Sequence, residues 1–159
     1  MYKLIKVWNA GEIEAAFFQE EGSGIVNMAV LPKGGTEKIV PHREIVSGTI
    51  ATKMKKYIFP ASLMESMVQI KFTGDYNFAQ HCSGVDMRNS TSIDRFHFVS
   101  QTENGNTLCT VFESDDNMRL THTLIHPEGC RYLECKVEFF NGSKESRRVE
   151  MFPSFSMGM

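Results

Sequence analysis

The chain lacks several features that would assign it to a common class. Its 159 residues contain no apolar run near the roughly 20 residues needed to span a bilayer. A net charge of −2 gives no electrostatic reason to expect binding to nucleic acid or to an anionic membrane. The N-terminal lysines are followed by neither a long apolar region nor a small-residue cleavage site, so we expect no signal peptide and a cytoplasmic protein.

Cysteine and histidine spacing argues against a metal centre. No C-x-x-C pair occurs among the four cysteines, which we expect to be reduced thiols packed mostly in or near the core. His122, His126 and Cys130 have the spacing of ligands on one helix face, but Pro127 and Gly129 would break a helix there. On a strand the two histidines would lie roughly 13 Å apart. Structural histidines are predicted, with no metal and no cofactor.

Catalytic motifs are also missing. The sequence contains no nucleophile elbow, no Walker A loop and no dinucleotide glycine fingerprint. Asp115 and Asp116 form the densest acid pair, but the run from Ser114 to Asn117 is typical of a tight hairpin turn. We therefore predict no catalytic residue in this chain.

Short extended segments separated by turn residues are what the sequence does contain. Glycine- and asparagine-rich turns at intervals of about 8–12 residues predict one all-β domain over residues 1–159, an antiparallel β-sandwich. Expected strands lie near residues 2–8, 13–19, 24–31, 63–73, 94–101, 107–113, 118–126, 131–140 and 147–157. Two stretches, 36–62 and 74–93, are irregular, and long loops of this kind tend to be functional or to face another domain.

The last 42 residues predict three strands joined by two turns, Pro127-Glu128-Gly129 and Asn141-Gly142-Ser143. Asparagine followed by glycine between alternating segments is a strong hairpin signal. We therefore expect strands 131–140 and 147–157 to pair, with Val137, Phe139, Val149 and Met151 facing the core. The chain reaches Met159 still apolar and extended, which indicates a module of a larger protein.

Two patches also resemble a known family. Residues 128–141 (EGCRYLECKVEFFN) and 149–158 (VEMFPSFSMG) are similar to strands of the N-terminal domain of α-galactosidases of glycoside hydrolase family thirty-six. Residues 63–74 (LMESMVQIKFTG) and 84–90 (GVDMRNS) resemble a second strand and the loop motif that follows it in that domain. The two stretches that contain these patches, residues 63–90 and 118–159, occur in the family's order and cover about 70 residues.

The resemblance implies a supersandwich-like domain, here shorter than the family's and therefore possibly truncated, whose catalytic barrel would follow Met159. The whole enzyme would hydrolyse terminal α-galactosides with retention of configuration. The family's nucleophile lies in a K-x-D motif, which does not occur here, so this chain by itself would be inactive. Implied partners are its own barrel, the α-galactoside bound by the full enzyme, and further copies in a homo-oligomer. A free-standing carbohydrate-binding or oligomerisation β-sandwich is the alternative.

The irregular segments supply the candidate contact residues. Aromatic and arginine side chains dominate interface energies once they are desolvated. The candidates are therefore Tyr76, Phe78, Arg88 and Asn89. These aromatic rings could instead pack at the bases of the loops, and that alternative stays open.

Overall fold

The computed structural model describes residues 2–47, 55–60, 64–75 and 90–154, with side chains described outside 42–60. Strands dominate these ranges, with short 3-10 turns at η1 (Thr36–Lys38) and η3 (Ile93–Arg95). The strands are β1 (Tyr2–Ala10), β2 (Ile13–Glu20), β3 (Val26–Pro32), β4 (His42–Ser47), β5 (Lys55–Pro60), β6 (Glu65–Ser66), β7 (Lys71–Phe72), β8 (Phe96–Asn104), β9 (Thr107–Ser114), β10 (Met118–Ile125), β11 (Glu134–Asn141) and β12 (Val149–Met151). The prediction of an all-β protein is confirmed.

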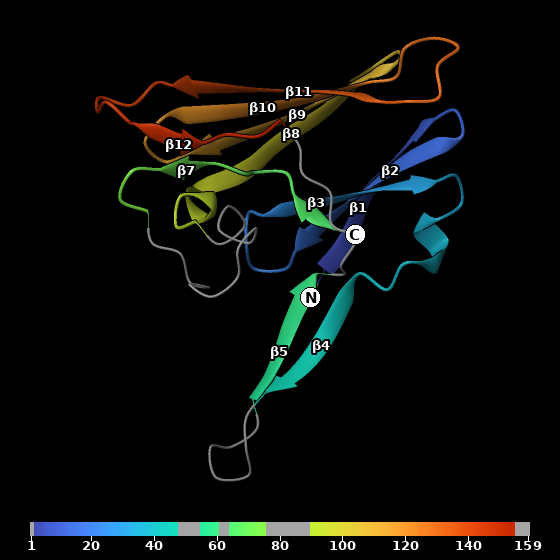
Figure 1. Ribbon diagram of the computed structural model, residues 1–159, viewed down its shortest axis with the longest axis horizontal. Coiled ribbons are helices and arrows are strands. Elements are labelled where there is room, and N and C mark those ends of the chain that lie inside the picture. Colours follow the sequence, from blue (N-terminus) through green and yellow to red (C-terminus); the bar gives the residue numbers. More distant parts are fainter. Residues whose placement is uncertain (1, 48–54, 61–63, 76–89, 155–159) are drawn as a thin grey trace.

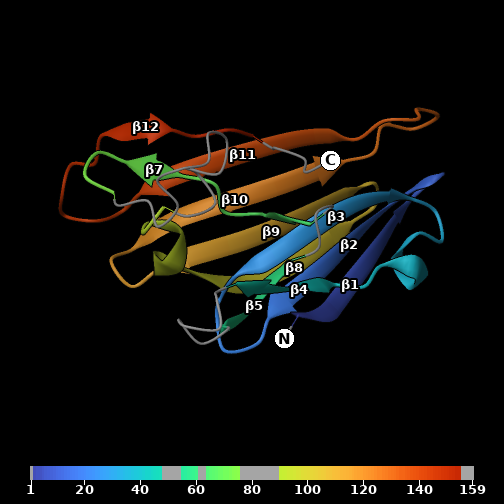
Figure 2. The same cartoon turned by 60° about the horizontal axis from the view of Figure 1, so that its bottom comes forward.

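Two four-stranded antiparallel sheets stack to form the sandwich (Figures 1 and 2). We call β1-β2-β3-β6 the first sheet and β11-β10-β9-β8 the second sheet. Phe17 and Met28 of the first sheet and Phe112 and Leu120 of the second belong to one buried apolar cluster. Burial of this shared face drives the two sheets together.

The central strands of the second sheet alternate as the sequence predicts. Every second residue of β9 and β10 is buried, and the others are partly or fully exposed. In the turn between them, the Ser114 hydroxyl accepts a hydrogen bond from the Met118 amide (3.0 Å) and donates one to Asp116 Oδ1 (2.6 Å). Asn117 adopts φ 64°, a conformation that asparagine tolerates. The prediction of a tight turn at Ser114–Asn117 is confirmed.

The first sheet is buried on both faces. Five consecutive residues of β2, from Glu14 to Phe18, are buried. Phe17 faces the second sheet, whereas Phe18 joins a separate cluster with Tyr2, Ala16, Ala29, Leu31 and Met64, against which Ile39 packs. The Glu14 carboxylate accepts hydrogen bonds from the Gly34 amide and from the amide and hydroxyl of Thr36. It thereby fixes the turn that leads from β3 into η1.

The predicted C-terminal hairpin is wrong. β11 pairs with β10, and β12 pairs with β7 instead of β11. The Gly142 amide donates to the Asn117 carbonyl (3.1 Å), so the Asn-Gly pair prolongs the β10–β11 ladder instead of turning the chain back into a hairpin. The turn near Pro127, which joins β10 and β11, is confirmed.

Four core positions were predicted on this part of the chain, and two of them are confirmed. Val137 and Phe139 pack against the main core, and Phe139 lies between the rings of Phe72 (5.5 Å) and Phe152 (6.1 Å). Val149 and Met151 are 40% and 43% exposed, so their predicted burial is wrong. Because β12 pairs with the two-residue strand β7, it lies at the margin of the sandwich, and its side chains do not enter the core.

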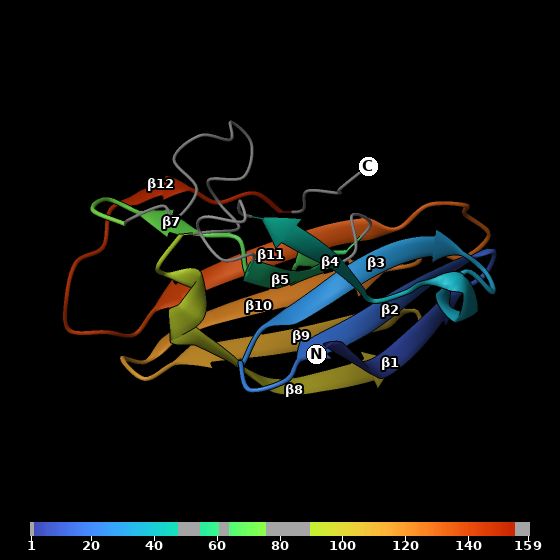
Figure 3. The same cartoon turned by 90° about the horizontal axis from the view of Figure 1, so that it is seen from below.

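The middle of the chain also departs from expectation. The strand predicted over residues 63–73 is two short strands, β6 and β7, joined by buried residues outside strand geometry. The irregular stretch 36–62 contains a hairpin, β4 with β5, where at most one short strand was predicted. This hairpin extends away from the stacked sheets in Figure 1, and Figure 3 shows it in front of the first sheet.

Candidate functional site

The contact candidates from the sequence, Tyr76, Phe78, Arg88 and Asn89, lie outside the described residues. The chain on both sides of their segment is described. One side ends at Asp75 after β7, and the other begins at Ser90 before η3. These two ends are in contact through a hydrogen bond between Ser90 and Asp75.

Asp75 joins the two ends. Its Oδ2 accepts hydrogen bonds from the Phe72 amide (2.8 Å) and the Ser90 hydroxyl (2.8 Å). Its Oδ1 accepts from the hydroxyls of Ser92 (2.8 Å) and Thr91 (3.2 Å). We call these five residues the Asp75 clamp. The Asp75 carboxylate therefore links Ser90, Thr91 and Ser92, which follow segment 76–89, to β7, which precedes that segment.

The clamp is built for a charged carboxylate. Partial burial favours the neutral acid, but the Phe72 amide and the three hydroxyls outweigh it and lower the pKa of Asp75 below its usual 3.8. Ser90 and Ser92 are buried, and the Ser92 amide donates to the Ser90 hydroxyl (3.2 Å). The clamp is thus a charge-assisted network at the edge of the sandwich, where it fixes the base of segment 76–89.

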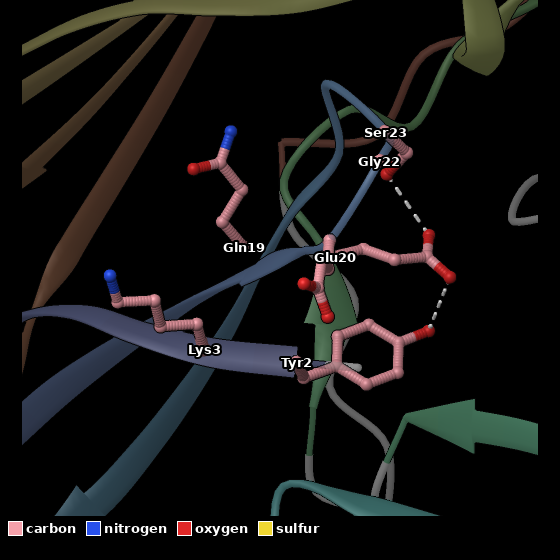
Figure 4. Close-up of a pocket in the computed structure, with 7 residues that line it drawn as sticks. Tyr2, Lys3, Gln19, Glu20, Gly22 and Ser23 are labelled. Carbon is pink, nitrogen blue, oxygen red and sulfur yellow. Dashed lines mark hydrogen bonds between the residues drawn. The ribbon is translucent and has the colours of Figure 1, made fainter.

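A pocket of about 490 Å³ lies beside the start of the chain (Figure 4). It forms where the first residues of β1 meet the end of β2 and the β2–β3 turn. Its lining consists of Tyr2, Lys3, Gln19, Glu20, Glu21, Gly22 and Ser23. Antiparallel pairing sets Tyr2 opposite Glu20 and Lys3 opposite Gln19.

Glu20 accepts hydrogen bonds from two other residues that line this pocket. The Tyr2 hydroxyl donates to its Oε1 (3.3 Å), and the Ser23 hydroxyl donates to its Oε2 (3.1 Å). The Ser23 oxygen in turn accepts a hydrogen bond from the Ile25 amide (3.2 Å). Burial and the neighbouring Glu20 charge raise the pKa of Tyr2, so the phenol stays protonated and acts as a donor.

A third polar group lies inside the sandwich, where His122 Nε2 is 3.4 Å from Cys135 Sγ. Burial lowers the pKa of His122 to about 4 and raises the pKa of Cys135 to about 11. At neutral pH both side chains are uncharged, so the imidazole does not generate a thiolate. The thiol also donates to the Ser154 carbonyl (3.2 Å), which ties the C-terminal segment to β11. This pair serves packing.

The other predicted histidine is structural in a different way. His126 contacts the carbonyl oxygen of Cys130 through its Nε2 (2.9 Å), across the turn between β10 and β11. Over residues 2–47, 55–60, 64–75 and 90–154, no three His, Cys, Asp or Glu side chains are placed to hold a metal ion. The same residues include no helix with the length and apolar character of a membrane span.

Sequence reasoning missed the Tyr2–Glu20–Ser23 site. Tyr2 and Glu20 are 18 positions apart, and no motif connects them. A β-bulge at Ile5 shifts the β1–β2 register by one residue, and this shift sets Tyr2 opposite Glu20. Counting back from the Ala10–Ile13 pair without the bulge would have paired Glu20 with Lys3.

Comparison of the chain with protein-family models, with curated proteins and with solved structures found no match.

Proposed function

We propose that the chain is the non-catalytic N-terminal β-sandwich domain of a retaining α-galactosidase-like glycoside hydrolase. The observation that carries the proposal is the Asp75 clamp. Ser90 ends the sequence patch Met87-Arg88-Asn89-Ser90 that resembles the family's loop motif, and its hydroxyl is bound by Asp75. A partly buried, charge-assisted anchor at that point supports the interpretation that segment 76–89 has a defined role, such as contact with a neighbouring domain.

The domain would support a catalytic barrel, shape the substrate entrance and help to assemble a homo-oligomer. One described feature extends from the sandwich toward such partners, the β4–β5 hairpin. Tyr76, Phe78, Arg88 and Asn89 remain the proposed contact residues within segment 76–89.

The acid pair that the sequence offers supports an inactive domain. The Asp115 side chain is 99% exposed at the tip of the β9–β10 turn. Asp116 accepts a hydrogen bond from Ser114, which lowers its pKa, and it also pairs with Arg147 (3.3 Å). Both carboxylates belong to a turn, whereas a glycosidase places its two acids on either side of a sugar.

The first prediction is that the purified chain does not hydrolyse a chromogenic α-galactoside, even at high protein concentration. Colour release by absorbance measures this directly. Turnover that survives repurification, and that is lost in Asp115→Asn or Asp116→Asn, would contradict the proposal.

The positive test uses the gene sequence beyond codon 159. If it encodes a barrel with paired aspartates, the barrel expressed alone should be poorly folded or weakly active, and adding this chain should restore activity. The variant Asp75→Asn should restore less, whereas Glu138→Gln, a matched carboxylate change on the outer face of β11, should restore as much as wild type. A native stop codon after Met159 would overturn the proposal and favour the second candidate.

The second candidate is a free-standing carbohydrate-binding β-sandwich. The pocket at Tyr2 and Glu20 favours it, because that pocket combines an aromatic side chain with an ordered carboxylate.

A further inference from the structure

The pocket beside Tyr2 has no part in the first of the two functions proposed above. It lies at the end of the β1–β2 pair, and no residue of the Asp75 clamp lines it. Its volume of about 490 Å³ falls within the range of small-molecule sites, which is roughly 300–1,000 Å³. A pocket of this size, lined by polar groups that hydrogen-bond to one another, is suited to a small polar ligand.

The Glu20 carboxylate is preorganised and retains acceptor capacity. Tyr2 and Ser23 each donate to a different oxygen of it, so both oxygens are held in position before a ligand arrives. Each carboxylate oxygen can accept two hydrogen bonds, which leaves one further acceptor position on each. Two adjacent acceptors of this kind suit two adjacent hydroxyl groups.

The rest of the lining defines the charge of the ligand. The lining contains two carboxylates, Glu20 and Glu21, and one ammonium group, Lys3, so the pocket disfavours phosphate and other anions. Lys3 and Gln19 lie on the side of the strand pair away from the Glu20 carboxylate in Figure 4, so a small ligand held by Glu20 lies beside the hydroxyls of Tyr2 and Ser23 instead.

We propose that this pocket binds a neutral polyhydroxylated ligand, a mono- or disaccharide, with Glu20 accepting hydrogen bonds from two neighbouring hydroxyls. Tyr2, whose ring is buried in the cluster on the outer face of the first sheet, holds the Glu20 carboxylate in place through its hydroxyl. The inference goes beyond the proposed function because this site would bind sugar with or without a catalytic barrel.

The test is a nuclear magnetic resonance titration of the ¹⁵N-labelled chain with methyl α-D-galactoside. The titration extends to roughly 50 mM, because weak small-ligand sites have dissociation constants near 1 mM. Amide signals of Lys3 and of residues 19–23 should shift and saturate, whereas signals of the second sheet should not. Sodium sulfate at the same concentration should shift none of them.

Two variants assign the binding to Glu20. Glu20→Gln keeps the shape and removes the charge, so the affinity should fall roughly tenfold. Ser23→Ala removes one of the two hydrogen bonds that hold the Glu20 carboxylate, so it should weaken binding by a smaller factor. If Glu20→Gln does not fold, the affinity of Ser23→Ala decides the outcome. Glu138→Gln, on the outer face of β11, should bind as wild type does.

The inference is overturned if the signals of residues 19–23 do not move with the sugar, or if Glu20→Gln and Ser23→Ala both bind as wild type does. Failure of the proposed function is distinguishable from this. If the chain has no downstream barrel but binds sugar at Glu20, the proposal of an α-galactosidase domain is contradicted and the sugar site inferred here is supported.

Discussion

The first and second sheets contain similar strands but are buried differently. In β9 and β10 of the second sheet, burial alternates residue by residue, so each strand has an inner and an outer side. In β2 of the first sheet, five successive residues are buried, and neighbouring rings such as Phe17 and Phe18 enter two different clusters. The second sheet is a wall of the sandwich, whereas the first sheet is its middle layer.

The chain between β3 and β6 creates this difference. From this stretch, Ile39 and Met64 contribute to the cluster on the outer face of the first sheet, and Glu14 fixes the turn that begins the excursion. A sheet with one covered face reads as alternating apolar and polar residues, and a sheet covered on both faces reads as a continuous apolar run. The described ends of the excursion, at Ile39 and Met64, therefore contribute to the core.

The largest effect should come from truncating rings on the outer side of the first sheet. Phe18 is 3% exposed, so Phe18→Ala should cost roughly 3–5 kcal/mol, as much as Phe17→Ala on the inner side. On the second sheet only one side should respond in this way. Phe112→Ala should cost a similar amount, and Val111→Ala, which is only half-buried, should cost roughly 1 kcal/mol or less.

Chemical denaturation of the four variants measures these losses. If Phe18→Ala were as mild as Val111→Ala, the outer face of the first sheet would be open, and the distinction between the two sheets would disappear.

A smaller effect should distinguish the edge of the second sheet from its centre. Phe139 on β11 is only partly buried between Phe72 and Phe152, so Phe139→Ala should cost roughly 2–3 kcal/mol. Val149→Ala and Met151→Ala, at exposed positions on β12, should each cost no more than about 1 kcal/mol. Denaturation midpoints give the order.

Glu150→Ala is the matched control, because its ion pair with Lys71 (3.5 Å) is partly exposed and is worth little. Equal losses at Phe139 and Val149 would restore the β11–β12 hairpin that the sequence predicted.

The smallest effect concerns two carboxylates, one on each sheet. Hydrogen bonds from the Thr36 hydroxyl, the Gly34 amide and the Thr36 amide lower the pKa of Glu14 below its usual 4.5. Glu14→Gln should therefore lower the melting temperature, by less than the ring truncations do. Glu113→Gln should leave it unchanged, since Glu113 only pairs with Arg119 at the surface (2.7 Å).

The effect of Glu14 should depend on pH. A carboxylate whose pKa is lower in the folded state stabilises the fold fully above about pH 4.5, and that contribution is lost as the pH falls through the lowered value. The melting temperatures of wild type and Glu14→Gln should converge below pH 4.5. A constant gap across this range would mean that Glu14 acts through packing alone.

Most of the second sheet could be predicted from the sequence, because its strands alternate and its turns contain Asn, Asp and Gly. β8, β9 and β10 and the turn at Ser114–Asn117 match expectation. The C-terminal pairing could not be predicted in this way. A local Asn-Gly signal competes with pairing between β12 and the distant strand β7, and the alternation of Val149 and Met151 does not identify the partner strand.

The candidate site was less accessible to sequence reasoning. Asp75 lies in a stretch predicted to be a polar loop, and nothing in the order of residues showed that Ser90, Thr91 and Ser92 return to it. The Tyr2–Glu20 pair depends on a single bulge at Ile5. Both sites arise from register and chain return, which are properties of the fold and not of a motif.

The thiol of Cys135 can serve as a chemical reporter of the residues that follow β12. Its hydrogen bond to the Ser154 carbonyl and its raised pKa of about 11 keep it protonated while the C-terminal segment is docked. An alkylating reagent reacts with thiolate, so modification at neutral pH should wait for this segment to detach and the pKa to return toward 9. The labelling rate at this one sulfur then reports how often Ser154 separates from β11.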